Sequence, residues 1–187
     1  MNHIGTKTLE TGRLILRRYQ IEDAKDAFEN WMNSEIVTKY LTWSPHRTIE
    51  ESRAYIQDCC IGNYGKDDFY LWVIVLKDTG ACIGSISVNE IQPDVDCCEI
   101  GYCMSDRYWG QGIMPEAFSA VIRFLFEEVG FNRIQSTHDV NNPASGRVME
   151  KCGLKYEGTL RQFGRNNQGI CDSVSRAILK DEYFASR

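Results

Sequence analysis

The chain has 187 residues, of which 43% are hydrophobic and 25% charged, and its formal net charge is −5. This length and apolar content predict one folded domain over 1–187 and exclude intrinsic disorder. The acidic balance argues against a direct nucleic-acid partner. No apolar run is long enough to span a membrane and the first residues lack the pattern of a signal peptide, so we expect a cytoplasmic protein without membrane contact.

Cysteine is frequent, with eight residues, but its spacing matches no metal or redox motif. Two pairs are adjacent in the sequence, Cys59-Cys60 and Cys97-Cys98, and no C-x-x-C occurs. Zinc sites and dithiol redox sites usually need that two-residue gap to bring two thiolates onto one turn. We therefore expect reduced cysteines, several of them buried as small apolar side chains, and no bound metal.

The first half of the chain predicts one strand, two helices and then three strands. Alternating apolar residues indicate a strand over 13–19, and apolar residues at helical spacing indicate a helix over 22–33. Thr48 and Glu51 form a capping box that opens a second helix, which ends near 60. Apolar runs over 69–76, 82–91 and 96–104, separated by turn residues, indicate an antiparallel meander.

The second half alternates helices with strands. An amphipathic helix is predicted over 115–129, a strand over 133–140 and a short helix from Asn142 to Gly153. Two strands follow, over 154–164 and 170–179. The order β-α-α-β-β-β-α-β-α-β-β predicts an α/β (α+β) fold with a mixed sheet of about seven strands. The step over 96–140 should be a parallel, right-handed crossover.

A glycine-containing segment, Trp109-Gly110-Gln111-Gly112-Ile113-Met114, lies between a predicted strand and the amphipathic helix. Two glycines allow close approach of the backbone to a ligand, and the helix start offers unpaired N–H groups and the positive end of its dipole. This combination favours a phosphate or pyrophosphate site, although a plain strand-to-helix turn would have the same pattern. The segment is neither a P-loop nor a dinucleotide-binding fingerprint.

Three blocks of the sequence carry a family resemblance. They are residues 9–17 (LETGRLILR), residues 99–117, which contain the glycine segment, and residues 142–158, which begin Asn142-Pro143-Ala144-Ser145 and end Tyr156-Glu157-Gly158. In order and spacing they resemble the GNAT acetyltransferases, in the branch with the bacterial ribosomal-protein N-terminal (alanine and serine) acetyltransferases. The resemblance covers nearly the whole chain and implies the GNAT fold, acetyl-CoA as cosubstrate and no metal.

The resemblance also implies which residues bind acetyl-CoA. The family loop, Q/R-x-x-G-x-G/A, falls on 109–114, where Gly112 matches while Trp109 and Met114 depart from the pattern. The strand residues 102–104 would pair with the pantetheine arm and offer an N–H group to the thioester oxygen. The full implied set is Tyr102, Cys103, Met104, Trp109, Gly110, Gln111, Gly112, Ile113, Met114, Asn142 and Ser145.

Acetylation of an amine requires an acceptor for the ammonium proton and a proton for the departing thiolate. Many family members donate this second proton from a tyrosine at a position that is Met149 here, so we assign the role to Ser145, with solvent as the alternative. For the proton acceptor we favour Glu99, which strand alternation places on one face with Gly101, and Glu157 is the alternative. We interpret His138 as a half-buried structural residue.

The acceptor should enter a groove between the first two helices and the last hairpin. Trp31, Tyr40, Trp43 and Phe163 are the residues that would line it. The favoured acceptor is a protein N-terminus, with a ribosomal protein as the expected partner. Two alternatives stay open, a small amine such as a polyamine, amino acid or aminoglycoside, and a catalytically silent acyl-CoA-binding regulatory module. The chain would act as a monomer or a homodimer.

Overall fold

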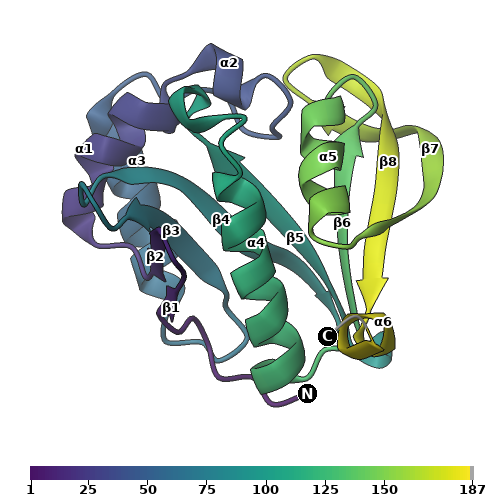
Figure 1. The fold of residues 1–187 in the computed structure, drawn as a ribbon. Coiled ribbons are helices and arrows are strands. Elements are labelled where there is room, and N and C mark those ends of the chain that lie inside the picture. Colours follow the sequence, from purple (N-terminus) through teal and green to yellow (C-terminus); the bar gives the residue numbers. More distant parts are fainter. Residues whose placement is uncertain (186–187) are drawn as a thin grey trace.

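The computed structural model describes residues 1–185, which contain a mixed eight-stranded sheet flanked by helices (Figure 1). The strands lie in the order β1-β2-β3-β4-β5-β6-β8-β7, and only β5 and β6 pair in parallel. Their bounds are Leu9–Glu10 (β1), Leu14–Arg17 (β2), Leu71–Leu76 (β3), Cys82–Gln92 (β4), Cys97–Met104 (β5), Arg133–Asp139 (β6), Lys155–Asn166 (β7) and Gly169–Leu179 (β8). The parallel step and the fold class predicted from the sequence are confirmed.

One strand more than expected is present, because the two residues of β1 are too few to show alternation in a sequence. Leu9 is buried and pairs with Leu16 of β2, so packing against the sheet defines this strand. Two short helices were also not predicted, α2 (Glu35–Thr38) and α6 (Lys180–Ala185). Ser34 caps α2 by accepting a hydrogen bond from Val37 N.

The helices predicted from the sequence are present but locally irregular. The first consists of a 3-10 turn over Ile21–Asp23, α1 (Ala24–Ala27) and a π-helical turn over Phe28–Met32. The second, α3 (Ile49–Tyr55), continues through helical turns to Asn63. The amphipathic helix α4 (Ile113–Phe124) continues to Val129, and α5 spans Pro143–Lys151.

Two apolar cores lie on opposite faces of the sheet. Alternate residues of β3 point to opposite sides, so Trp72 and Ile74 pack with α4 while Val73 and Val75 pack with α1 and its continuation. Helices α4 and α5 therefore share one face, and α1 and α3 cover the other (Figure 1). Because helices cover both faces, β3 is buried along its whole length, as its continuous apolar run indicates.

The sheet opens between β5 and β6. These strands pair only at Cys97↔Arg133, Cys98↔Ile134 and Glu99↔Gln135, and then diverge (Figure 1). On its other edge β5 stays paired with β4 as far as Gly84↔Met104. The β5 edge that faces β6 therefore has no strand partner in its second half, and this edge lies where the sequence predicts the cosubstrate.

Candidate functional site

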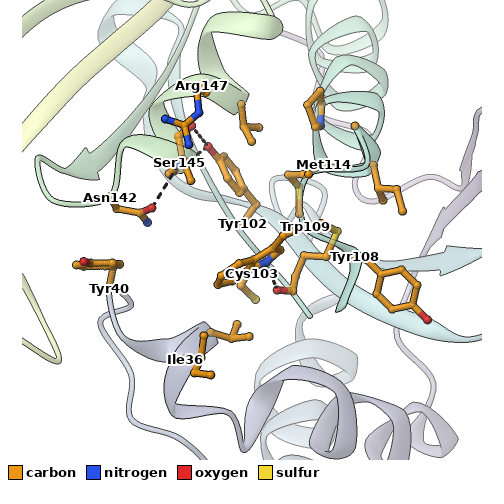
Figure 2. Close-up of a pocket in the computed structure, with 18 of the residues that line it drawn as sticks. Ile36, Tyr40, Tyr102, Cys103, Tyr108, Trp109, Met114, Asn142, Ser145 and Arg147 are labelled. Carbon is orange, nitrogen blue, oxygen red and sulfur yellow. Dashed lines mark hydrogen bonds between the residues drawn. The ribbon is translucent and has the colours of Figure 1, made fainter. Parts of the chain in front are cut away.

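Two pockets meet at the opening between β5 and β6. The first, called the loop pocket here, has a volume of about 480 Å³ and lies between the glycine loop, the starts of α4 and α5 and the end of β5 (Figure 2). The second, called the strand pocket here, has a volume of about 620 Å³ and lies over β4, β5 and β6 on the side of Trp31. Six residues line both pockets: Tyr40, Leu41, Tyr102, Cys103, Asn142 and Ser145. Two ligands bound in the two pockets would meet at these residues.

The glycine loop has the backbone of an anion-binding turn. Gly110 and Gly112 have φ angles of +76° and +72°, a region that side chains other than glycine rarely adopt. None of the backbone N–H groups from 110 to 114 donates to another group within residues 1–185. Because α4 starts at Ile113, its positive dipole end adds to these donors. The loop can therefore bind a pyrophosphate without a basic side chain of its own.

Arg13 holds this loop in place from the start of the chain. Its Nη1 donates to the carbonyl oxygen of Gln111 at 3.0 Å, and its Nε donates to Glu116 of α4 at 2.7 Å. Burial acts to raise the pKa of Glu116, but hydrogen bonds from Thr11 and Arg13 outweigh it and lower the pKa. The first of the three resembling blocks thus anchors the second, a contact between distant parts of the chain.

The side chains of the loop differ in whether they line the pocket. The Trp109 indole donates to the Met104 carbonyl oxygen at 2.9 Å, and the ring lines the loop pocket while staying 49% exposed. Gly110, Gly112, Ile113, Met114 and Met104 also line this pocket. Gln111 does not, because its side chain turns back to donate to the carbonyl oxygen of Arg107.

Three cationic side chains of the loop pocket were missed in the sequence. Arg147 and Lys151 lie four residues apart on one face of α5, and Lys39 lies across the pocket. The i, i+4 spacing of Arg147 and Lys151 is visible in the sequence, but it indicates a ligand site only once α5 is known to lie beside the loop. These side chains supply positive charge for a phosphate-bearing ligand in an acidic protein.

Tyr102 and Ser145 form a hydroxyl pair where the two pockets meet. The Tyr102 oxygen lies 2.9 Å from Ser145 Oγ and 3.0 Å from the Ser145 carbonyl oxygen (Figure 2). Burial holds the pKa of Tyr102 well above its usual range, so the phenol stays protonated. The Asn142 side chain caps α5 by accepting from Ser145 N, which fixes the first turn that carries Ser145. The sequence predicts Tyr102 on the strand that binds the cosubstrate, but it predicts no role for the Tyr102 phenol.

Met149 is only 1% exposed and packs in the core on the α4 face, so its side chain does not line either pocket. A proton donor has to come from another position, and the Tyr102–Ser145 pair is available.

Glu99 lies in the wall of the strand pocket. Its carboxylate accepts hydrogen bonds from Thr137 Oγ1 at 3.1 Å and Gln135 Nε2 at 3.2 Å, both on β6. The small Gly101 suggests free space beside the Glu99 carboxylate, but this space is filled. The Asn89 amide from a bulge in β4 fills it, and a Cβ at Gly101 would collide with this amide. Glu99 is therefore oriented by neutral partners and not by an ion pair.

Two other candidates are less suited to proton transfer. Glu157 forms an ion pair with Arg133, which lowers the pKa of this carboxyl, and it lines neither pocket. His138 bonds through Nδ1 to the carbonyl oxygen of Asp139 at 2.8 Å. Its Nε2 packs against α5, because a Cβ at Gly146 would lie 2.5 Å from that nitrogen.

Of the four residues expected to contact the acceptor, three line the strand pocket: Trp31, Tyr40 and Trp43. Phe163 lines neither pocket and is 72% exposed on β7. No group of three or more His, Cys, Asp or Glu side chains within residues 1–185 is arranged to hold a metal ion. No helix in this part of the chain is long and apolar enough to cross a membrane.

Comparison with known proteins identifies the family. A family model described as an acetyltransferase (GNAT) domain matches residues 13–155. The chain belongs to this GNAT acetyltransferase family and is an acetyl-CoA-dependent N-acetyltransferase. It is similar to the uncharacterized N-acetyltransferase YoaA of Bacillus subtilis, 33% identical over 172 residues, which cover 92% of this chain and 96% of the relative.

Two further similarities concern ribosomal-protein acetyltransferases. The ribosomal-protein-serine acetyltransferase of Escherichia coli is 36% identical over 80 residues, which cover 43% of this chain and 45% of the relative. A solved structure of RimL, a ribosomal L7/L12 alpha-N-protein acetyltransferase in complex with coenzyme A, superposes with a TM-score of 0.83. The two sequences are 22% identical, and the superposition covers 94% of this chain and 99% of the RimL chain. At this identity the similarity shows a shared fold only.

We predict that Gly112→Val raises the dissociation constant of coenzyme A at least tenfold, because a side chain at φ +72° distorts the N–H cradle. Gly80→Val is the matched control, since Gly80 has φ +74° but lines neither pocket. Both variants should lose roughly 1–2 kcal/mol of stability. Titration calorimetry and thermal unfolding measure the two effects, and equal affinity in both variants would contradict the placement.

Proposed function

We propose that this enzyme acetylates the N-terminal α-amine of a protein, with direct attack of the amine on acetyl-CoA while both substrates are bound. The observation that carries the proposal is the meeting of two pockets at Tyr102, Cys103 and Ser145. A shared boundary lets an amine in one pocket reach a thioester in the other. The ribosomal-protein serine acetyltransferase of E. coli, a relative over part of the chain, supports a protein N-terminus as acceptor.

The loop pocket suits acetyl-CoA. The N–H groups of 110–114 would hold the pyrophosphate, and Arg147 and Lys151 would lie close enough to attract the phosphates. On the β5 edge that lacks a strand partner, Ser136 and Trp109 already donate to the carbonyl oxygens of Ile100 and Met104. The backbone of Tyr102 between them would form strand-like hydrogen bonds with the extended pantetheine arm. Acetyl-CoA supplies an activated acyl group, and the chain's own residues bind, orient and exchange protons.

The strand pocket suits the acceptor amine. Tyr40 and Trp43 form an aromatic wall, and the inner faces of β5 and β6 supply Glu99 and Thr137. An α-amine has a pKa near 8, against about 10 for a lysine amine, so more of it is neutral and nucleophilic near neutral pH. The Glu99 carboxylate would accept the ammonium proton directly or through one water, and its two β6 partners keep it turned to the pocket.

The Tyr102–Ser145 pair would return a proton to the departing thiolate. The Ser145 hydroxyl would donate towards the sulfur while Tyr102, held protonated by burial, donates to Ser145 Oγ. As Ser145 gives its proton to sulfur it receives the Tyr102 proton, and a proton from water restores the phenol, so neither hydroxyl keeps a charge. This arrangement gives the enzyme an acid although Met149 faces the core.

Acceptor panels test the proposal. With acetyl-CoA and a thiol-detecting reagent, we expect turnover on peptides with free N-termini such as alanine or serine, and little on spermine or aminoglycosides. Turnover on spermine with none on any peptide would favour the small-amine alternative. Binding of coenzyme A without turnover on any amine would favour the silent module.

We predict that Glu99→Gln lowers kcat by about 10²-fold or more, because the amide cannot accept a proton, while acetyl-CoA affinity is retained. Glu90→Gln is the matched control. Glu90 pairs with Glu99 across β4 and β5 but is exposed and lines neither pocket. Steady-state kinetics from pH 6 to 9 compare the variants, and the same rate in both at every pH would exclude Glu99 as the base.

We predict that Tyr102→Phe and Ser145→Ala each lower kcat about tenfold or more, and that the double variant is hardly slower than either single one. Residues that act as one unit are not additive. A multiplicative loss in the double variant would mean that the hydroxyls act separately. Unchanged KM for acetyl-CoA would distinguish lost proton transfer from lost binding.

A further inference from the structure

Two buried hydrogen-bond donors in the strand pocket have no acceptor in the protein. Five buried side-chain polar atoms within residues 1–185 lack a hydrogen-bond partner: Tyr19 Oη, Trp31 Nε1, Ser105 Oγ, His138 Nε2 and Arg176 Nε. Of these, Tyr19, Trp31 and His138 line the strand pocket. His138 Nε2 packs against Gly146, as described above. Tyr19 and Trp31 therefore remain as polar groups without an assigned task.

Both groups are suited to donate. An indole N–H can only donate, and Trp31 is fully buried. Tyr19 is 4% exposed, and burial raises the pKa of its phenol well above the usual range, so the O–H is retained. Ser85 of β4 lines the same pocket, but Tyr19 Oη forms no hydrogen bond with it. A buried donor without an acceptor is unfavourable, and a ligand oxygen would offset this cost.

The location of the donors limits where that oxygen lies on the acceptor. Tyr19 and Trp31 belong to the apolar cluster on the α1 face of the sheet, Cys103 packs against this cluster, and Cys103 lines both pockets. The donors therefore lie near the boundary at which the amine would meet the acyl group. Only an oxygen a few bonds from the reacting nitrogen can bind there, as in an α-amino carbonyl group.

We infer that Trp31 Nε1 and the Tyr19 hydroxyl bind the carbonyl or carboxylate oxygen next to the reacting amine, which makes α-amino carbonyl compounds the acceptor class. The inference rests on the proposed function in so far as the strand pocket holds the acceptor. A peptide N-terminus offers a carbonyl oxygen and a free amino acid offers a carboxylate, and both fit the same donors. Polyamines carry no oxygen and would leave both donors without one.

The test compares acceptors that differ in this oxygen. We would measure kcat/KM for an alanine-initiated peptide, alaninamide, alanine and 3-methylbutan-2-amine, which replaces the carboxamide by an isopropyl group. Because the alkylamine has the higher pKa, the rates are compared at equal concentrations of neutral amine, and on that basis the wild-type enzyme should prefer alaninamide by about tenfold or more. Tyr19→Phe and Trp31→Phe should each reduce that preference about fivefold to tenfold, the range expected for one neutral hydrogen bond.

Controls separate binding from folding. Trp72→Phe also removes a buried indole donor, one that donates to the Lys7 carbonyl oxygen outside both pockets, and it should leave the preference unchanged. Tyr19→Phe keeps the aromatic ring, so this variant remains informative if Trp31→Phe unfolds. The thermal unfolding temperature of every variant shows whether it is folded. Tyr156→Phe, on the exposed β7, is the control for loss of a phenol.

Each outcome decides between the hypotheses. Turnover of alaninamide or alanine but of no peptide would reject the protein N-terminus while supporting the oxygen contact. If peptides are acetylated but Tyr19→Phe and Trp31→Phe keep the wild-type preference for alaninamide over 3-methylbutan-2-amine, the oxygen contact is wrong and the protein N-terminus stands. A wild-type preference for 3-methylbutan-2-amine or spermine would overturn it, and so would failure to acetylate or bind any carbonyl-bearing acceptor.

Discussion

The early end of pairing between β5 and β6 is the constraint on which the rest of the site depends. After Glu99↔Gln135 the two strands separate, and one edge of β5 is left without a strand partner inside a sheet covered on both faces. Ser136 and Trp109 donate to the carbonyl oxygens of Ile100 and Met104 on this edge, and the remaining backbone groups need a ligand or solvent as partner. The opening also lets side chains from both faces reach one point, since Tyr102 packs towards α4 and Cys103 towards the α1 face. The two pockets meet there for this reason.

The charge around each pocket differs from the net charge of the whole chain. The whole chain carries a formal charge of −5, yet the loop pocket combines a helix N-terminus with Arg147, Lys151 and Lys39. Glu116 lies in the first turn of the same helix, but Arg13 neutralises it and ties it to the loop. The strand pocket differs, because two carboxylates, Glu99 and Asp139, line it against one arginine, Arg165, and their side-chain partners are hydroxyl and amide groups. Net charge therefore does not predict either pocket.

Much of the fold could be read from the sequence, because apolar periodicity reports directly which faces are buried. The long strands, α4 and α5 were predicted within a few residues, as was the parallel step between β5 and β6. The elements that were missed, β1, α2 and α6, have two to six residues and owe their form to packing and a single cap. The glycine loop was also predicted, since positive φ angles leave a composition signal at Gly110 and Gly112.

The side-chain geometry of the site could not be read in this way. The family, the cosubstrate class and the glycine positions of the loop could be predicted from the amino-acid order, because they depend on local chemistry and ordered motifs. Only the tertiary structure placed Met149 in the core, paired Tyr102 with Ser145, filled the space at Gly101 with Asn89 and left Phe163 outside both pockets. Each of these facts depends on contacts between residues far apart in the chain, and sequence periodicity carries no information about which distant side chains meet.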